Sequence, residues 1–263
     1  MKQAMAFLHG GGLGAIQRVR GLCYKSRPSI GTKPDGPVPK GVDYDLWLGP
    51  APERPFNPNR FHYNWHWYWD YGNGDIGNQG AHEMDKCRWA LNRAEMPRSV
   101  TCVGGRLGYQ DDGETPNTSV TVLDYGDAKI VFEVRGLGTD GYKALGGKAD
   151  EVKIGNVFEC EKGVLTSPNY TSGIAYDLDG KVLKKFGGGD DTLHVRNFVD
   201  AVKAGKPGNV AATALDGHLS SSMCHLANIS YRVGESRPLG GKDAFGGDAD
   251  GAEALGRMVG HLK

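Results

Sequence analysis

Several features that mark common classes of protein are missing from this sequence. It has no run of about 18 or more apolar residues, and Met1 is not followed by the basic and apolar regions of a secretory leader. Its 31 Lys and Arg residues balance 31 Asp and Glu residues, so the net charge is zero and no overall field favours nucleic acid or an anionic membrane. These absences predict a cytoplasmic protein that binds neither nucleic acid nor membrane, unless a leader precedes Met1.

Paired cysteines are also missing. The five cysteines are odd in number and widely spaced, and no two of them form a Cys-x-x-Cys pair. A disulfide framework or a zinc site needs cysteine pairs at short spacing. We therefore expect each cysteine to be a small buried residue in a reducing compartment.

A complete dinucleotide-binding motif is missing as well. Such a site needs a strand, a tight glycine turn, a helix and an acidic residue roughly 20 positions later. The segment Gly10–Ala15 satisfies G-x-G-x-x-A, but it follows a predicted helix at Lys2–His9 and precedes a predicted strand at Ile16–Tyr24. Because this order is reversed, the glycines predict a helix end and a turn, and we assign no cofactor-binding residue.

The order of the predicted elements favours an α+β fold. Between Ser99 and Phe186, short runs with strand character are separated by Gly, Asp or Asn turns, and Asp179-Gly180 is the strongest hairpin pattern. Helices are predicted at Thr192–Ala204 and Ala212–Val233. Strands grouped together, with helices towards both ends, are typical of α+β architecture. Five residues of the second helix have core-like spacing: Leu215, Leu219, Cys224, Leu226 and Ile229.

The composition predicts one domain. The chain has 263 residues and no long Pro/Ser linker, so we expect residues 1–239 to bury a single core. Residues 240–263 form a Gly-rich tail that we expect to pack poorly. The predicted loop from Ser26 to Gly74 is too long to be an idle connection, which makes it a candidate wall of a substrate site.

The segment GDIGNQGAHEMDKCRWAL, from Gly74 to Leu91, carries several acid, base and amide groups. Asn78 lies four residues before His82, and Asp85 three residues after it, so one helix would place all three on one face. An imidazole held at the edge of a cleft can exchange protons with a substrate hydroxyl. The simpler alternative is a helix in which Asp85 caps His82 and neither residue has a function.

The aromatic stretch before this segment suits a sugar. Trp65, Trp67, Trp69 and Tyr71 alternate with polar residues, so an extended segment would present rings on one side and polar groups on the other. A sugar has apolar C–H faces and a rim of hydroxyl groups, which match such a surface. The alternative is a loop fixed by ordinary aromatic burial. The candidate substrate-binding residues are Tyr24, Lys25, Arg27, His66, Trp67, Asp70 and Asp85.

Two of these candidates and one pair of histidines allow other interpretations. Lys25 and Arg27 can bind an acidic sugar or a phosphate, or form surface ion pairs worth under about 1 kcal/mol. His62 and His66 have the spacing of two ligands on a helix, but the surrounding residues do not favour a helix. Since no compact ligand motif accompanies them, no metal is predicted.

Long blocks of the sequence resemble one known family. RGLCYKSRPSIG, the stretch from Asp43 to Asp85, GGRLGYQDDGETPNT, HVRNFVDAVKAGKP and GHLSSSMCHLANISYRVG follow one another in this order. Together they resemble the C-terminal half of the glucose–fructose oxidoreductase and inositol dehydrogenase (Gfo/Idh/MocA) superfamily, most closely its bacterial sugar-oxidoreductase-like branch. The resemblance covers nearly the whole chain. It implies a broad, largely antiparallel sheet with helices packed on one face, which shapes a substrate pocket and often mediates oligomers.

The resemblance also implies groups that this sequence lacks. Family members carry an N-terminal Rossmann domain that binds NAD or NADP, and a catalytic lysine in a Glu-Lys-Pro motif. Here Lys-Pro occurs only at Lys33 and Lys206, and neither lysine follows a glutamate. His82 matches the family's catalytic histidine, whereas Asn78 stands where many members have aspartate, and an amide cannot take up a proton. We therefore expect this chain alone to bind no cofactor, with NAD(P) implied for the complete family enzyme.

Three classes of function remain open. The first is the substrate-binding domain of an NAD(P)-dependent sugar or polyol oxidoreductase, as a fragment or completed by a separate Rossmann-domain polypeptide. The second is a cofactor-independent carbohydrate lyase or hydrolase, and the third is a non-catalytic carbohydrate-binding scaffold. An in-frame Rossmann segment upstream would favour the first class. The expected partners are a sugar-like small molecule and a second copy of the chain in a homo-oligomer, and whether this chain acts as an enzyme stays open.

Overall fold

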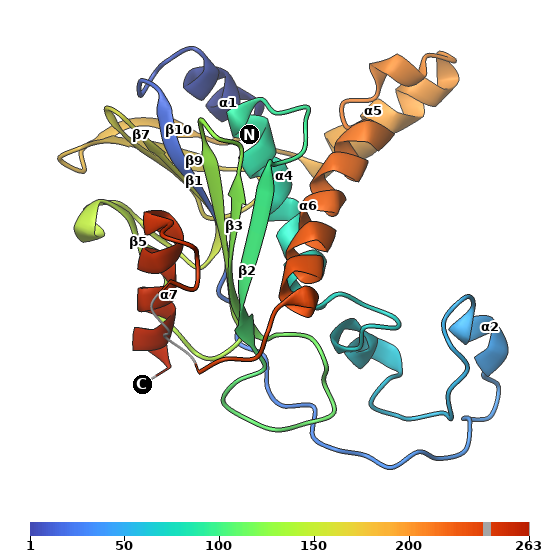
Figure 1. Cartoon of the computed structure of the whole chain (residues 1–263). Helices are drawn as coiled ribbons and strands as arrows, with labels where there is room; N and C mark the ends of the chain where they lie inside the picture. Colours follow the sequence, from blue (N-terminus) through green and yellow to red (C-terminus); the bar gives the residue numbers. More distant parts are fainter. Residues whose placement is uncertain (239–242, 263) are drawn as a thin grey trace.

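The computed structural model describes residues 1–238 and 243–262, and an eight-stranded sheet forms its centre (Figure 1). The strands lie in the order β10-β9-β8-β7-β1-β4-β3-β2. β1 and β4 pair in parallel, and the other neighbouring strands of this sheet pair antiparallel. Their bounds are β1 (Ile16–Cys23), β2 (Ser99–Gly105), β3 (Thr118–Asp124), β4 (Lys129–Arg135), β7 (Ile154–Cys160), β8 (Gly163–Ser167), β9 (Gly173–Asp177) and β10 (Val182–Phe186).

Helices cover both faces of this sheet. The inner face, as we call it, packs against α1 (Lys2–His9), α3 (Gly74–Asn78), α4 (Gly80–Leu91) and α6 (Ala214–Val233). The outer face packs against α7 (Ala249–His261) and a hairpin of β5 (Tyr142–Lys143) and β6 (Glu151–Val152) with the 3-10 turn η2 (Ala144–Gly147). Figure 1 shows α7 and α6 on opposite sides of β2 and β3. The remaining helices are α2 (Tyr44–Leu48), η1 (His62–Trp67), α5 (Asp191–Lys203) and η3 (Pro207–Asn209).

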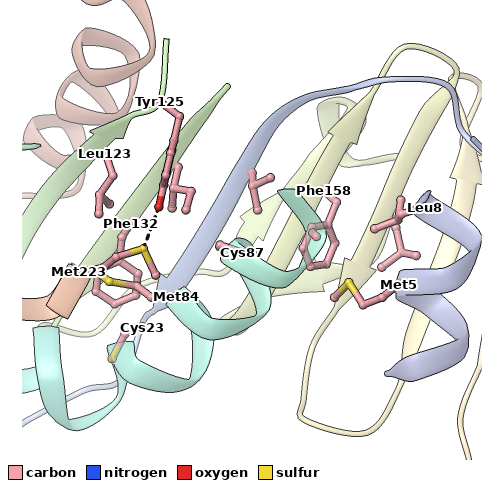
Figure 2. Close-up of a cluster of buried hydrophobic side chains, with 14 of the residues drawn as sticks. Met5, Leu8, Cys23, Met84, Cys87, Leu123, Tyr125, Phe132, Phe158 and Met223 are labelled. Atoms are coloured by element: carbon pink, nitrogen blue, oxygen red, sulfur yellow. Dashed lines mark hydrogen bonds between the residues drawn. The ribbon is translucent and has the colours of Figure 1, made fainter. Parts of the chain in front are cut away.

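Strand alternation separates an apolar inner face from a partly charged outer face. On β4, Ile130, Phe132 and Val134 belong to the inner core, whereas Glu133 and Arg135 point to the other side. Figure 2 shows Phe132 beside Met84 of α4 and Met223 of α6, with the Tyr125 hydroxyl 3.3 Å from the Met223 sulfur. The inner core therefore joins the sheet to both helices that lie closest to the candidate site.

The seating of α4 on the sheet depends on two glycines beside Phe132. A β-carbon at Gly21 of β1 would lie 2.8 Å from the Phe132 ring and 3.2 Å from the Glu83 β-carbon. A β-carbon at Gly80 would also lie 2.8 Å from that ring. From β7, the Asn156 amide donates to the Glu83 carbonyl oxygen at 2.9 Å. α4 can therefore lie directly on the central strands, which places its residues at a fixed height above the sheet.

The outer face holds a buried cluster of ionic side chains. Glu133 is 0% exposed, and its carboxylate accepts hydrogen bonds from Arg135 at 3.0 Å and from Arg257 of α7 at 3.0 Å. The Tyr24 hydroxyl donates to the same carboxylate at 2.8 Å. Arg20 of β1 lies 3.5 Å from it. These contacts connect α7 to β1 and β4 across the centre of the outer face.

The predicted α+β class and the broad, largely antiparallel sheet are confirmed. The predicted turn at Gly10–Gly14 is present between α1 and β1, with positive φ at Gly11 and Gly14. The five cysteines are free and buried, as expected. α7 adds a helix to the outer face that the sequence pattern did not predict.

Two helical predictions need correction. The single helix predicted over Gly74–Leu91 is divided at Gln79 into α3 and α4, so Asn78 and His82 do not share one regular helix. In α6, Leu215 and Ile229 have core-like spacing but are exposed, because described residues cover only part of this helix.

The predicted poorly packed tail is also wrong for most of its length. Residues of α7 pack Ala254, Leu255 and Met258 against Val120 and Val131 of the sheet. The glycines in this segment suggested poor packing, but one of them, Gly251, faces Phe245 and leaves room for its ring. The predicted boundary between residues 239 and 240 lies outside the described residues.

The long loop before α3 is more ordered than a connecting loop. It includes α2 and η1, so the predicted extended aromatic segment is instead a 3-10 helix over His62–Trp67. Away from the sheet, aromatic rings with centroids 5.0 to 5.6 Å apart form a small cluster of Tyr44, Trp47, Phe56, Phe61 and Tyr71. Ordinary aromatic burial therefore holds this part of the loop.

None of the helices in residues 1–238 and 243–262 combines the length and the apolar composition that a membrane crossing requires.

The outer-face cluster yields a stability prediction for Glu133. Glu133→Gln removes the one buried carboxylate shared by three guanidinium groups, so we expect the free energy of unfolding to fall by about 3–5 kcal/mol. Glu95→Gln, which removes an exposed partner of Arg93, should leave the free energy of unfolding almost unchanged. Urea titration of both variants measures the difference. Equal losses in the two variants would show that the buried cluster does not hold α7 on the sheet.

Candidate functional site

His82 lies on the exposed side of α4, within the first turn of the helix. Its ring centroid is 4.9 Å from that of Tyr170, which belongs to the turn between β8 and β9. One helical turn further on, the Lys86 ammonium lies 5.6 Å from the centre of the Tyr170 ring. His82, Lys86 and Tyr170 therefore form one group, although Tyr170 is far from the other two in sequence.

The environment of His82 favours the neutral imidazole. Partial burial of the ring and the positive charge of Lys86 lower the pKa of His82 from its ordinary value of 6.5, while Asp85 opposes this effect. Burial also lowers the pKa of Lys86, with Glu83 opposing that shift. At neutral pH, His82 is thus in the form that accepts a proton.

Glu83 is a buried acid directly beneath this group. It is 0% exposed, and the Gln79 amide nitrogen lies 3.3 Å from each of its carboxylate oxygens. Burial raises the pKa of Glu83 to about 7, with Lys86 acting in the opposite direction. Glu83 can therefore hold or release a proton near neutral pH. No sequence pattern indicated that Glu83 is buried, because its burial follows from the packing of α4 against Gly21.

Asn78 and Arg27 meet at a second buried carboxylate, Asp75 of α3. The Arg27 guanidinium donates two hydrogen bonds to Asp75, at 3.0 and 2.8 Å, and the Asn78 amide nitrogen lies 3.3 Å from the same carboxylate. The guanidinium also lies over the rings of Tyr63 and Trp67. Arg27 is therefore occupied in joining the long loop to α3, and its charge is balanced by Asp75. Sequence reasoning did not single out Asp75.

The other predicted site residues are distributed over three places. Lys25 is close enough to α4 to oppose the raised pKa of Glu83, and the His66 ring stacks on the Trp65 ring with centroids 3.8 Å apart. Tyr24 lies on the outer face against Glu133.

Asp70 and Asp85 have partners of their own. Asp70 pairs with Arg54 at 2.5 Å. The Asp85 carboxylate accepts from the Ser220 hydroxyl at 2.6 Å and lies 3.3 Å from Arg88. The structure thus shows Asp85 joining α4 to α6, and it shows no hydrogen bond from Asp85 to the His82 ring.

The glycine turn at Gly10–Gly14 does not have the chemistry of a phosphate site. It lines a cleft of about 720 Å³ at the far end of α4, together with residues Ala90–Arg93. α1 and α4 both end there, so the cleft lies at the negative ends of two helix dipoles, and the Ala15 amide already donates to Glu161 at 3.0 Å. The described residues therefore do not fit a dinucleotide at this turn.

Within residues 1–238 and 243–262, no group of three or more His, Cys, Asp or Glu side chains is arranged to hold a metal ion. His62 and His66 lie on η1, where His66 packs between Tyr63 and Trp65.

Comparison with known proteins identifies the domain. Residues 15–255 match the model of a family described as an oxidoreductase family, C-terminal α/β domain. No curated protein sequence matches the chain.

Solved structures with the same fold are considerably longer. An oxidoreductase from Thermotoga maritima is 15% identical, with a TM-score of 0.55 over 89% of this chain and 58% of that one. A WlbA dehydrogenase from Bordetella pertussis, solved with NADH and UDP-GlcNAcA, is 16% identical, with a TM-score of 0.51 over 90% of this chain and 59% of that one. An oxidoreductase from Yersinia pestis is 13% identical, with a TM-score of 0.55 over 90% and 60%. The chain thus spans less than two thirds of each.

The raised pKa of Glu83 yields a prediction for stability against pH. Because the pKa in the folded chain, about 7, exceeds the ordinary 4.5, the contribution of the protonated acid is complete below pH 4.5 and is lost as the pH rises through 7. Between pH 5 and pH 8, the wild-type free energy of unfolding should therefore fall by about 2–3 kcal/mol relative to Glu83→Gln.

Denaturant titration of both proteins at the two pH values measures this difference. Glu53→Gln, at an exposed position, serves as the control and should follow the wild type. Parallel pH profiles for the wild type and Glu83→Gln would mean that Glu83 ionises normally in the folded chain.

Proposed function

The chain belongs to the Gfo/Idh/MocA oxidoreductase family, because residues 15–255 match the C-terminal α/β domain of that family. We propose that it forms the substrate-binding part of an NAD(P)-dependent oxidoreductase that acts on a sugar, a polyol or a derivative. The observation that carries this proposal is the neutral, exposed His82 above the buried acid Glu83 on α4. Oxidation of an alcohol requires a base that removes the hydroxyl proton, and His82 supplies it.

The substrate class follows from the chemistry of the site and from one relative. His82, Asn78 and Lys25 offer an imidazole, an amide and an ammonium group, which suit the hydroxyl groups of a sugar. The WlbA dehydrogenase from Bordetella pertussis was solved with a sugar nucleotide, UDP-GlcNAcA, and with NADH. We extend only the class, a sugar derivative, to this chain.

The proposed roles concern the proton and the substrate. His82 accepts the hydroxyl proton. The Asn78 side-chain oxygen, to which no described residue donates, accepts a hydrogen bond from a neighbouring hydroxyl, while its side-chain nitrogen contacts Asp75. Lys25 contacts the substrate, while Arg27, His66 and Trp67 form the wall that holds α3 in place. Asp85 positions α4 against α6. Tyr24 and Asp70 are left out of the proposed site because their partners lie elsewhere.

Cofactor binding is assigned to a Rossmann part that this chain does not supply. The described residues do not fit a dinucleotide at the one glycine-rich turn that resembles its motif, and the solved relatives are longer than this chain. The exposed apolar side chains of α5, Leu193, Val195, Phe198 and Val202, fit this arrangement, since such a face is normally covered by another part of a protein.

Cofactor-independent proton transfer is the second candidate function. It is favoured by the pairing of a neutral His82 with Glu83, whose pKa of about 7 suits an acid and a base working at the same pH. A carbohydrate lyase needs these two roles and no hydride acceptor.

A homo-oligomer and a cytoplasmic location complete the proposal. An uncovered apolar face of the sheet would favour an oligomer, but α7 and the β5–β6 hairpin cover the outer face. The oligomer therefore stays a prediction that rests on the family. The five free, buried cysteines suit a reducing compartment.

The first test concerns the cofactor. Calorimetric titration of the 263-residue chain with NADH and with NADPH should give no dissociation constant in the micromolar range, because half a site cannot offset the cost of immobilising a dinucleotide. Micromolar binding of either cofactor would contradict the assignment of this role to another part.

The second test concerns His82 and the sugar. In saturation-transfer NMR with glucose, N-acetylglucosamine, glucuronate, myo-inositol and UDP-GlcNAcA, the wild type should bind at least one compound, and His82→Ala should weaken that binding about tenfold by the loss of a hydrogen bond. Its free energy of unfolding should change by less than about 0.5 kcal/mol, since His82 is exposed.

His225→Ala, an exposed histidine on α6, is the matched control and should bind like the wild type. If His82→Ala unfolds the chain but leaves the affinity of the folded fraction unchanged, His82 has a structural role and the proposed site is wrong.

A further inference from the structure

The turn between β8 and β9 is fixed by its own hydrogen bonds. The Asn169 side-chain oxygen accepts from the backbone amides of Thr171 at 2.9 Å and Ser172 at 2.8 Å, and from the Ser172 hydroxyl at 3.0 Å. The Asn169 carbonyl oxygen accepts from the Ser167 hydroxyl at 2.9 Å and from Lys86 of α4 at 3.3 Å. This turn therefore holds Tyr170 in one position above α4.

The Tyr170 side chain is anchored at its hydroxyl oxygen. The Gln79 amide nitrogen donates to this oxygen at 2.8 Å, and the same nitrogen lies 3.3 Å from the buried Glu83 carboxylate. Gln79 is itself only 7% exposed, so the contact comes from within the protein. Since Tyr170 accepts here, its own O–H hydrogen is left to donate, and it has no acceptor among the residues that the structure describes.

Much of the Tyr170 ring nevertheless faces solvent. The residue is 52% exposed although both its backbone and its hydroxyl are held. An aromatic ring that serves only packing gains by being covered, whereas a fixed and open ring beside His82 presents an apolar surface next to a base. The ring, the free O–H and the imidazole thus face one patch of the surface.

We propose that Tyr170 is a substrate-binding residue of the His82 site, whose ring packs on the apolar C–H face of a sugar and whose hydroxyl donates to a sugar oxygen. This inference rests on the proposed function and adds to it a wall from the turn between β8 and β9. With Tyr170 packed on one face of the sugar, a hydroxyl group of the sugar comes to lie against His82. Gln79 is the positioning residue, since it acts through the Tyr170 oxygen and does not touch the sugar.

The test uses two substitutions of Tyr170 and the NMR probes glucose, N-acetylglucosamine, glucuronate, myo-inositol and UDP-GlcNAcA. Tyr170→Phe keeps the ring and loses one hydrogen bond, so the dissociation constant of the best-bound probe should rise about 2- to 10-fold. Tyr170→Ala loses the ring as well, so it should rise about 10- to 50-fold. Phe198→Ala, an aromatic residue of α5 that is 58% exposed, is the control and should bind like the wild type.

The outcomes separate this inference from the proposed function. If the wild type binds a probe, His82→Ala weakens that binding and both Tyr170 variants bind like the wild type, Tyr170 is not a binding residue while the proposed function stands. If the wild type binds none of the probes, both ideas fail. Should Tyr170→Ala unfold the chain, Tyr170→Phe decides, because it retains the packing of the ring: an unchanged dissociation constant overturns the inference, and a rise of at least about twofold supports it.

Discussion

The close contact of α4 with the central strands is the constraint on which the candidate site depends. A side chain at Gly21 or Gly80 would collide with Phe132, so only glycine at these positions lets the helix approach this near. The approach buries Glu83 without a charged partner within ion-pair distance among the described residues, and loss of water then raises its pKa to about 7. The same approach turns His82 outward. One steric condition therefore produces both members of the proposed acid–base pair.

The two faces of the sheet have different roles: the inner face positions the proposed site, and the outer face holds α7 on the sheet. The inner face is apolar and carries α4, so its packing fixes the height and rotation of the site (Figure 2). The outer face carries Glu133 and the guanidinium groups of Arg20, Arg135 and Arg257. Removing these charges from water is costly, and their mutual hydrogen bonds offset that cost only while α7 remains on the sheet. The attachment of α7 is therefore more sensitive to a single lost charge than the inner core is.

The proposed site has the features of a half-site for a redox reaction. It offers a base, a buried acid and a wall for a sugar, whereas its glycine turn meets the negative ends of two helices. The solved relatives extend well beyond the region that this chain matches. The proposed function assigns hydride transfer to another part, and the exposed face of α5 offers a surface for it.

The sequence by itself determined the strands, most helices and the reversed order around Gly10–Gly14, because these depend on local periodicity and turn residues. It also indicated His82, through spacing and resemblance. It did not indicate that Glu83 is buried, that Asp85 turns to Ser220, or that Tyr170 lies over α4.

Only the tertiary structure decided these points, since each depends on the contact of residues far apart in the chain. Burial of Glu83 comes from β1, and the place of Tyr170 comes from a turn that the sheet brings back to α4. Local sequence fixes which groups a helix carries, but the pKa and the partners of those groups depend on what packs against the helix.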